Sequence, residues 1–156
     1  MKTTASHVRA DETDPLWVLG DQLRFLGSVA DRDLHVIDVR VPPGSGTPPH
    51  RHKSIEIFQV TEGEITFGVF DDGLPRMIVG RPGSVVTLPA NLGHNYQNNS
   101  SAPASMTVVV EGQMREFFEE VGTHSAPPPG PPSADAIGRI LAACQRHGIE
   151  VMGPPQ

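Results

Sequence analysis

Short apolar runs separated by turn-forming residues dominate the chain from residue 16 to about residue 111. Val, Ile, Phe and Thr are concentrated in these runs, and Gly, Pro, Asp and Asn stand between them, a pattern typical of strands joined by tight turns. We expect strands at 17–19, 22–29, 34–41, 55–60, 65–70, 76–79, 85–88, 94–98 and 105–111, with a hairpin turn at Asp71-Asp72-Gly73. Strands at such even intervals predict a sandwich or a barrel.

The pattern changes to a helical period in the C-terminal third. Residues 113–121 and 134–147 each carry one apolar stripe. The stripes consist of Met114, Phe117, Phe118 and Val121 in the first helix, and of Ile137, Ile140, Leu141 and Cys144 in the second. Ser133 is a predicted N-cap, and the Pro-rich segment 127–132 is an extended connector. A helix with a single apolar stripe packs on one side only, so both helices are expected on the outside of the barrel.

These patterns divide the 156 residues into a loose polar arm at 1–14, a barrel at 15–112 and a helical extension at 113–156. The length suits one domain with its own core. A formal net charge of −6 argues against nucleic acid as a partner. We see no apolar run long enough for a membrane span and no signal core. With a single cysteine, Cys144, the chain has no intrachain disulfide, and we expect a soluble cytoplasmic protein.

Two segments carry candidate chemistry. In the first, alternate residues of an extended strand share a face, so His50, His52 and Glu56 point the same way if the alternation holds. Two imidazoles and a carboxylate on one face form a metal-ligand set with open positions. In the second, the apolar strand at 85–88 is followed by a Pro/Gly turn and then His94, a plausible fourth ligand. The alternative is that these are ordinary surface or core histidines.

The two segments resemble the two motifs of the cupin superfamily. Every spacing of the first motif is met, by Gly44, His50, His52, Glu56 and Gly63. The second is matched by Gly83, Pro89, His94 and Asn98, while Asn91 stands where the motif has glycine. Asn tolerates the left-handed backbone that glycine usually supplies, so we expect the turn to survive.

The resemblance implies an all-β, double-stranded β-helix, the jelly-roll or cupin barrel, with the two helices packed outside. It also implies that His50, His52, Glu56 and His94 bind one divalent transition metal near one end of the interior. Imidazole and carboxylate ligands suit Fe, Mn, Ni, Co or Zn, and the residues do not decide among them.

Other polar residues on the same strands are candidates for the pocket. If His94 points inward, so do Tyr96 and Asn98. Tyr96 then either orients substrate or shuttles a proton, or it is a packed tyrosine whose hydroxyl bonds to the backbone. Asn98 is better explained as a structural hydrogen-bonder. His35 alternates with apolar residues and is more readily explained as a satisfied core histidine than as a site residue.

Among cupins, the compact form with both motifs is similar to the quercetin-dioxygenase-like group. The resemblance favours a metal-dependent oxygenase acting on a small cyclic, enolic or aromatic metabolite, with Glu56 and Tyr96 as catalytic candidates. The alternatives are a non-oxidative metal-dependent isomerase, cyclase or decarboxylase, and a non-catalytic small-molecule-binding protein. We also expect a homodimer, because a small barrel leaves strand edges to cover.

Overall fold

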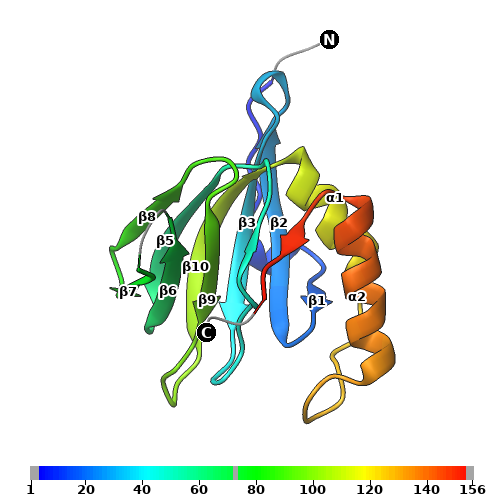
Figure 1. The fold of residues 1–156 in the computed structure, drawn as a ribbon. Helices are drawn as coiled ribbons and strands as arrows, with labels where there is room; N and C mark the ends of the chain where they lie inside the picture. The colour runs from blue at the N-terminus through cyan, green and yellow to red at the C-terminus, as the bar shows by residue number, and fades with distance from the viewer. Residues whose placement is uncertain (1–3, 72–73, 154–156) are drawn as a thin grey trace.

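The computed structural model describes residues 4–71 and 74–153, and within them the strands form two antiparallel sheets (Figure 1). The larger sheet has the order β1 (Leu16–Val18), β2 (Asp21–Val29), β3 (Leu34–Val41), β10 (Ala104–Glu111), β5 (Glu56–Glu62) and β8 (Val85–Leu88). The smaller sheet has the order β11 (Glu150–Val151), β4 (His50–Arg51), β9 (Gly93–Gln97), β6 (Ile65–Phe70) and β7 (Arg76–Gly80). The predicted all-β barrel is therefore confirmed.

The predicted strands recur with small shifts at their ends. β3, β6 and β8 have the expected bounds, whereas β5 begins one residue later than predicted and extends to Glu62. The pattern missed β4 and β11, because a strand of two residues is too short to show alternation. The predicted hairpin turn includes residues 72 and 73, which lie outside the described part of the chain.

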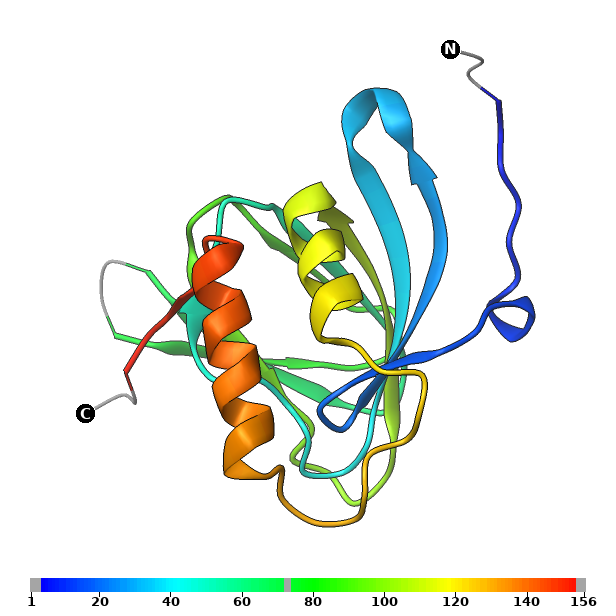
Figure 2. The same ribbon diagram turned by 90° about the vertical axis from the view of Figure 1, so that its right-hand side faces the viewer.

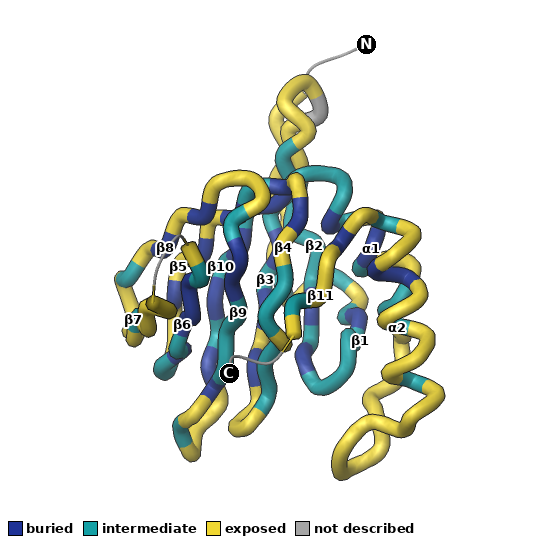
Figure 3. Tube along the Cα trace, in the orientation of Figure 1, coloured by how far each residue is buried: buried dark blue, intermediate teal, exposed yellow. Residues whose placement is uncertain are grey.

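The core lies between the two sheets and follows from the alternation of side chains along each strand. In β10 the even-numbered residues from Ala104 to Val110 are buried, and in β5 Glu56, Phe58 and Val60 are buried. The rings of Phe58 on β5 and Phe67 on β6 lie 5.2 Å apart, so the larger and smaller sheets pack through aromatic side chains. Figure 3 shows these inward positions as buried segments of the tube.

Two helices cover one side of the barrel, α1 (Gly112–Val121) and α2 (Ala134–Arg146) (Figure 2). Met114 and Phe117 of α1 are buried, as the apolar stripe predicts. In α2, Cys144 is buried but Leu141 remains 46% exposed, so only part of its predicted stripe is covered. The expectation that both helices lie outside the barrel is confirmed, and both also supply residues to the wall of an internal cavity.

Hydrogen bonds fix the ends of these outer segments. The Ser133 hydroxyl accepts a hydrogen bond from the Ala136 amide at 3.1 Å and is the N-cap of α2, as predicted. At the other end of the chain, the arm contains the short 3-10 helix η1 (Ala10–Glu12), and Arg24 donates to the carbonyl of Ala10 at 3.1 Å. A second 3-10 helix, η2 (Ala30–Arg32), connects β2 and β3. The end of the arm is thus fixed to β2 instead of being loose.

Candidate metal centre

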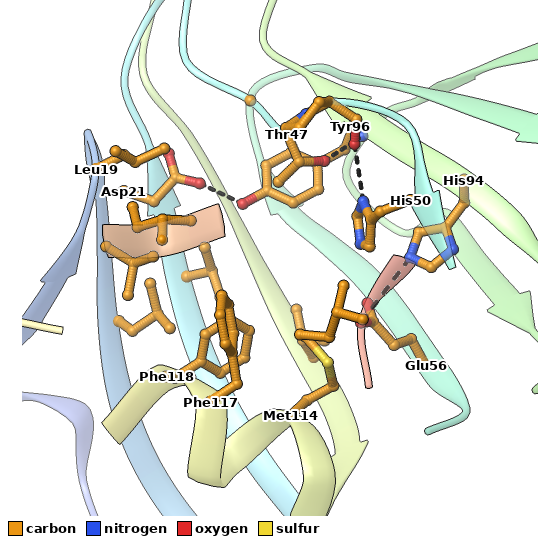
Figure 4. A pocket seen from close by; sticks show the side chains of 18 of the residues that line it. Leu19, Asp21, Thr47, His50, Glu56, His94, Tyr96, Met114, Phe117 and Phe118 are labelled. Atoms are coloured by element: carbon orange, nitrogen blue, oxygen red, sulfur yellow. Dashed lines mark hydrogen bonds and ion pairs between the residues drawn. The ribbon is translucent and has the colours of Figure 1, made fainter. Parts of the chain in front are cut away.

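Both sheets contribute to one cluster of three histidines and a glutamate. His50 on β4 and His94 on β9 are direct partners in the smaller sheet. Glu56 is the first residue of β5 in the larger sheet, and His52 lies on the segment between β4 and β5. One potential ligand atom from each residue lies within 4.8 Å of all the others, and Figure 4 shows three of the four converging. The structure thus brings together all four residues of the predicted ligand set.

The turn before β9 joins the two motif segments. Asn91 has a φ of 65°, the left-handed conformation that its place in the motif predicts. In this conformation its amide donates to the carbonyl of His52 at 2.7 Å. The substitution of Asn for the usual glycine therefore preserves a backbone contact that holds the first ligand segment against the second.

Each histidine is oriented by a hydrogen bond from Nδ1 to a backbone carbonyl two residues away. His50 Nδ1 bonds to Pro48 O at 2.8 Å, His52 Nδ1 to Ser54 O at 2.9 Å, and His94 Nδ1 to Leu92 O at 2.8 Å. A carbonyl can only accept, so Nδ1 carries the proton in all three rings. In the neutral rings, Nε2 therefore presents a lone pair toward the centre of the cluster, as metal-binding histidines do.

Two of these lone pairs have no satisfactory partner in the described part of the chain. His52 Nε2 and His94 Nε2 are fully buried and lack a hydrogen-bond partner among residues 4–71 and 74–153. His52 Nε2 lies 2.8 Å from Glu56 Oε1, but a lone pair facing a carboxylate oxygen is an acceptor facing an acceptor unless the ring is protonated. A divalent cation bound between these atoms would satisfy both groups at once. The buried, unpartnered nitrogens and the N₃O donor set therefore fit a transition metal.

Burial and neighbouring charges keep the cluster in its metal-binding protonation state. Burial, together with the nearby His94, lowers the pKa of His50 from 6.5 to about 4. Burial also lowers the pKa of His94. Burial alone would raise the pKa of Glu56, but the surrounding imidazoles, with His52 Nε2 2.8 Å from Glu56 Oε1, lower it below its ordinary value. At neutral pH, His50 and His94 are thus neutral and Glu56 is ionised, as metal binding requires.

A cavity of about 130 Å³ opens beside the cluster. Its walls are mainly apolar and come from the inner faces of β2, β3 and β10 and from both helices. Met114, Phe117 and Phe118 of α1 form one side of it (Figure 4). Within the described residues, no lysine or arginine lines this cavity. The site can therefore take a small, mostly apolar molecule whose oxygen atoms reach the metal position.

The predicted inward orientation of Tyr96 is observed, with a partner that the sequence did not suggest. Tyr96 lines the cavity, and its hydroxyl donates to the Asp21 carboxylate instead of to the backbone. Ser45 also donates to Asp21, at 2.6 Å. Asp21 was missed because no motif contains it. The available signal was a carboxylate that shares a face of β2 with Leu23.

Other candidate residues have structural roles. The Asn98 amide donates to the carbonyls of Val41 and Ala102 at 2.9 and 2.8 Å, as a structural hydrogen-bonder is expected to do. His35 bonds to Asp33 and Arg115 and lies away from the cavity lining, which agrees with the satisfied-histidine interpretation. No described helix has the length and apolar character that crossing a bilayer demands.

Comparisons with solved structures identify similar folds. A sugar phosphate isomerase of the cupin superfamily from Silicibacter pomeroyi is 25% identical, with a TM-score of 0.57 over 68% of this chain and 75% of that one. A predicted oxalate decarboxylase from Thermotoga maritima is 21% identical, with a TM-score of 0.58 over 68% and 98%. A polyketide cyclase from Streptomyces resistomycificus is 20% identical, with a TM-score of 0.57 over 69% and 80%.

The comparison with protein families covers the barrel itself. Residues 37–110, from the middle of β3 to the second-last residue of β10, match the family described as Cupin domain. This segment contains all four residues of the candidate metal centre. A search of curated proteins finds no significant relative. The barrel topology, the converging histidine and glutamate side chains and the family match agree: residues 37–110 form a cupin domain, and the chain has the cupin fold.

Proposed function

We propose that this protein is a metal-dependent enzyme that catalyses a non-oxidative reaction of a small enolisable ketone or keto acid. The reaction class is that of an isomerase, cyclase or decarboxylase. The observation that carries the proposal is the candidate ligand set beside a cavity whose polar groups are carboxylates, imidazoles, a phenol and the hydroxyl of Thr47. Such groups suit the movement of protons on a bound carbonyl compound.

Different residues of the site would supply the metal ligands, the base and the apolar surroundings of this reaction. His50, His52, Glu56 and His94 would hold the metal, which would supply Lewis acidity toward a substrate carbonyl oxygen. Glu56 is buried and ionised and lies at the edge of the cavity, so it is the candidate base for a proton next to that carbonyl. The apolar walls exclude water from the reacting end, which strengthens the electrostatic interactions there.

The character of the cavity also limits the substrate. The isomerase at 25% identity is described as acting on a sugar phosphate. Here, the described cavity lining has no lysine or arginine to bind a phosphate. We therefore infer that the shared feature is the proton-transfer chemistry and that the substrate of this chain has a mainly apolar body.

The oxygenase that the resemblance to the quercetin-dioxygenase-like group suggested remains a prediction. None of the three solved structures described above is an oxygenase by its description. The same ligand set is compatible with oxygen chemistry, so an experiment must separate the two reactions.

Hydrogen exchange measured under strict anaerobiosis distinguishes the non-oxidative reaction from the oxygenase reaction. Protein loaded with Mn²⁺, Fe²⁺, Co²⁺, Ni²⁺ or Zn²⁺ is incubated in D₂O with a panel of β-diketones, β-keto acids and hydroxyketones, and deuterium at the α-carbon is followed by NMR. We expect metal-dependent exchange or product formation in the wild type, its loss in Glu56→Gln, and wild-type rates in His124→Ala, which alters an exposed histidine.

Two other outcomes would replace this proposal. Oxygen consumption in air, without anaerobic exchange or product, would indicate the oxygenase. Tight binding of a panel compound that is recovered unchanged under both atmospheres would indicate a binding protein.

A further inference from the structure

Asp21 is a buried carboxylate at the opposite end of the cavity from the metal centre. It is 4% exposed and lies at the start of β2, beside the cavity residues Leu19 and Leu23. None of the ion pairs among the described residues includes it. Burial raises the pKa of Asp21 despite the hydrogen bonds from Ser45 and Tyr96. A carboxylate kept in such a place is costly for folding.

The hydrogen bonds to Asp21 use only part of the carboxylate's capacity to accept hydrogen bonds. Ser45 Oγ donates to Oδ1 at 2.6 Å, and the Tyr96 hydroxyl donates to Oδ2. A carboxylate offers about four lone-pair sites, so each oxygen keeps about one for a further donor. Figure 4 shows Asp21 and the histidines on opposite sides of the Tyr96 ring. The cavity therefore has two polar ends with apolar side chains between them.

We propose that Asp21 is a second substrate anchor, which accepts a hydrogen bond from a hydroxyl or protonated amine at the end of the substrate remote from the metal. The inference rests on the proposed function for the metal-binding end. It assigns a chemical class to the ligand: an oxygen donor for the metal, an apolar body, and a neutral or cationic donor group at the far end. A carboxylate or phosphate at that far end would be repelled.

A purely structural explanation also exists, in which Asp21 only joins the β1–β2 turn to the loop that carries Ser45. This explanation requires the two hydrogen bonds but predicts no preference for the far end of a ligand. The two explanations therefore differ in ligand selectivity and not in stability.

The test uses β-diketones with alkyl arms that lengthen by one carbon at a time. Each arm ends in a hydroxyl, a methyl ether, an ammonium or a carboxylate, and acetylacetone is the armless reference. Binding to Mn²⁺-loaded wild-type protein is measured by calorimetry. At the arm length that spans the cavity, we expect the hydroxyl to bind about tenfold tighter than its methyl ether, and the ammonium at least about tenfold tighter than the carboxylate.

Two variants locate the effect. Asp21→Asn should abolish the ammonium preference, and Asp38→Asn, which changes a half-buried carboxylate in β3 that alternates with the inward-facing residues, should keep it. Equal binding of hydroxyl and ether at every length, no ammonium preference, or preferences that survive Asp21→Asn would each overturn the proposal. If Asp21→Asn fails to fold, the comparisons among arms in the wild type decide alone.

The design separates this proposal from the one on which it rests. Acetylacetone binding depends only on the metal-binding end. If acetylacetone binds and the arms add no selectivity, Asp21 is not an anchor. If acetylacetone does not bind, the proposed function fails, and alkylammonium ions are compared with alkanoates of equal length. In that case, tighter binding of the ammonium in wild type than in Asp21→Asn would still support the anchor, and equal binding would overturn it.

Discussion

At the scale of single residues, the protonation of the histidine cluster controls how stable the metal-free protein is. The folded-state pKa of His50, about 4, lies below its ordinary value of 6.5. Between these values the unfolded chain binds more protons than the folded chain, so stability rises with pH across this window. Neutral imidazole rings favour metal binding. Because the folded apoprotein keeps His50 neutral, its free energy of unfolding decreases in acid.

This argument predicts a pH dependence that a single substitution reduces. In chelator-treated protein, the free energy of unfolding should fall by about 2–3 kcal/mol as the pH decreases from 6.5 to 4 through the contribution of His50. His50→Gln should show a shallower slope in urea titrations across that range, while His124→Gln should keep the wild-type slope. An unchanged slope in His50→Gln would show that His50 is not buried in its neutral form.

The sequence predicted the candidate ligand cluster but not the second polar end of the cavity. His50, His52, Glu56 and His94 follow from alternation and motif spacing, which are local properties. Asp21 becomes part of the site only through the Ser45 and Tyr96 hydroxyls, which lie 24 and 75 positions away along the chain. Pairings at such distances depend on the register between strands, which the apolar pattern does not specify.

At the scale of elements, Asn98 holds the end of β9 in place. Its amide donates to the carbonyls of Val41 and Ala102, and its Oδ1 accepts from the amide and hydroxyl of Ser100. The residue is fully buried, so these groups would lose their partners without replacement by water.

Asn98→Ala should therefore lower the free energy of unfolding by about 2–4 kcal/mol in urea titrations. The neighbouring Asn99 is exposed, so Asn99→Ala should have a small effect of at most about 0.5 kcal/mol. Equal effects of the two substitutions would contradict the structural role of Asn98.

The sequence predicted the strands of three or more residues, with shifts at some of their ends, but missed the two strands of only two residues. The bounds of β3, β6 and β8 are as expected, because each has a complete run of β-forming residues between turn signals. β4 and β11 exist only because they pair with each other and, for β4, with β9. Their formation depends on tertiary contacts, and local propensity therefore does not show it.

At the scale of the whole molecule, the C-terminal segment covers one side of the cavity. Ile140 and Cys144 of α2, together with Ile149, line it. Gln113 joins this segment to the residues between β4 and β5, because its amide group donates to His147 O at 2.8 Å and accepts from the Ser54 amide at 2.7 Å. These two contacts hold the C-terminal segment against the barrel.

Cys144 is the single cysteine, so its reaction with a thiol reagent reports opening of the segment. We expect slow labelling in the wild type, because the thiol is buried and burial raises its pKa. Gln113→Ala should speed labelling about tenfold, whereas Gln145→Ala, an exposed position on α2, should leave it unchanged. Fast labelling of the wild type would contradict the close packing of this segment on the barrel.

The homodimer expected from the strand edges remains a proposal. Exposed apolar residues on the outer side of the larger sheet, Ile57 and Val85, support an interface there. We expect light scattering of the purified protein to give twice the mass of the chain. A monomer at micromolar concentration would contradict the proposal.

The central claim is that three imidazoles and one carboxylate bind a single metal ion inside the barrel, and anomalous diffraction tests it most directly. Crystals of Co²⁺-loaded protein, measured at the cobalt edge, should show one strong anomalous peak about 2.0–2.2 Å from Nε2 of His50, His52 and His94 and from a carboxylate oxygen of Glu56. A map without a peak among these four side chains, or with its strongest peak elsewhere on the chain, would contradict the claim.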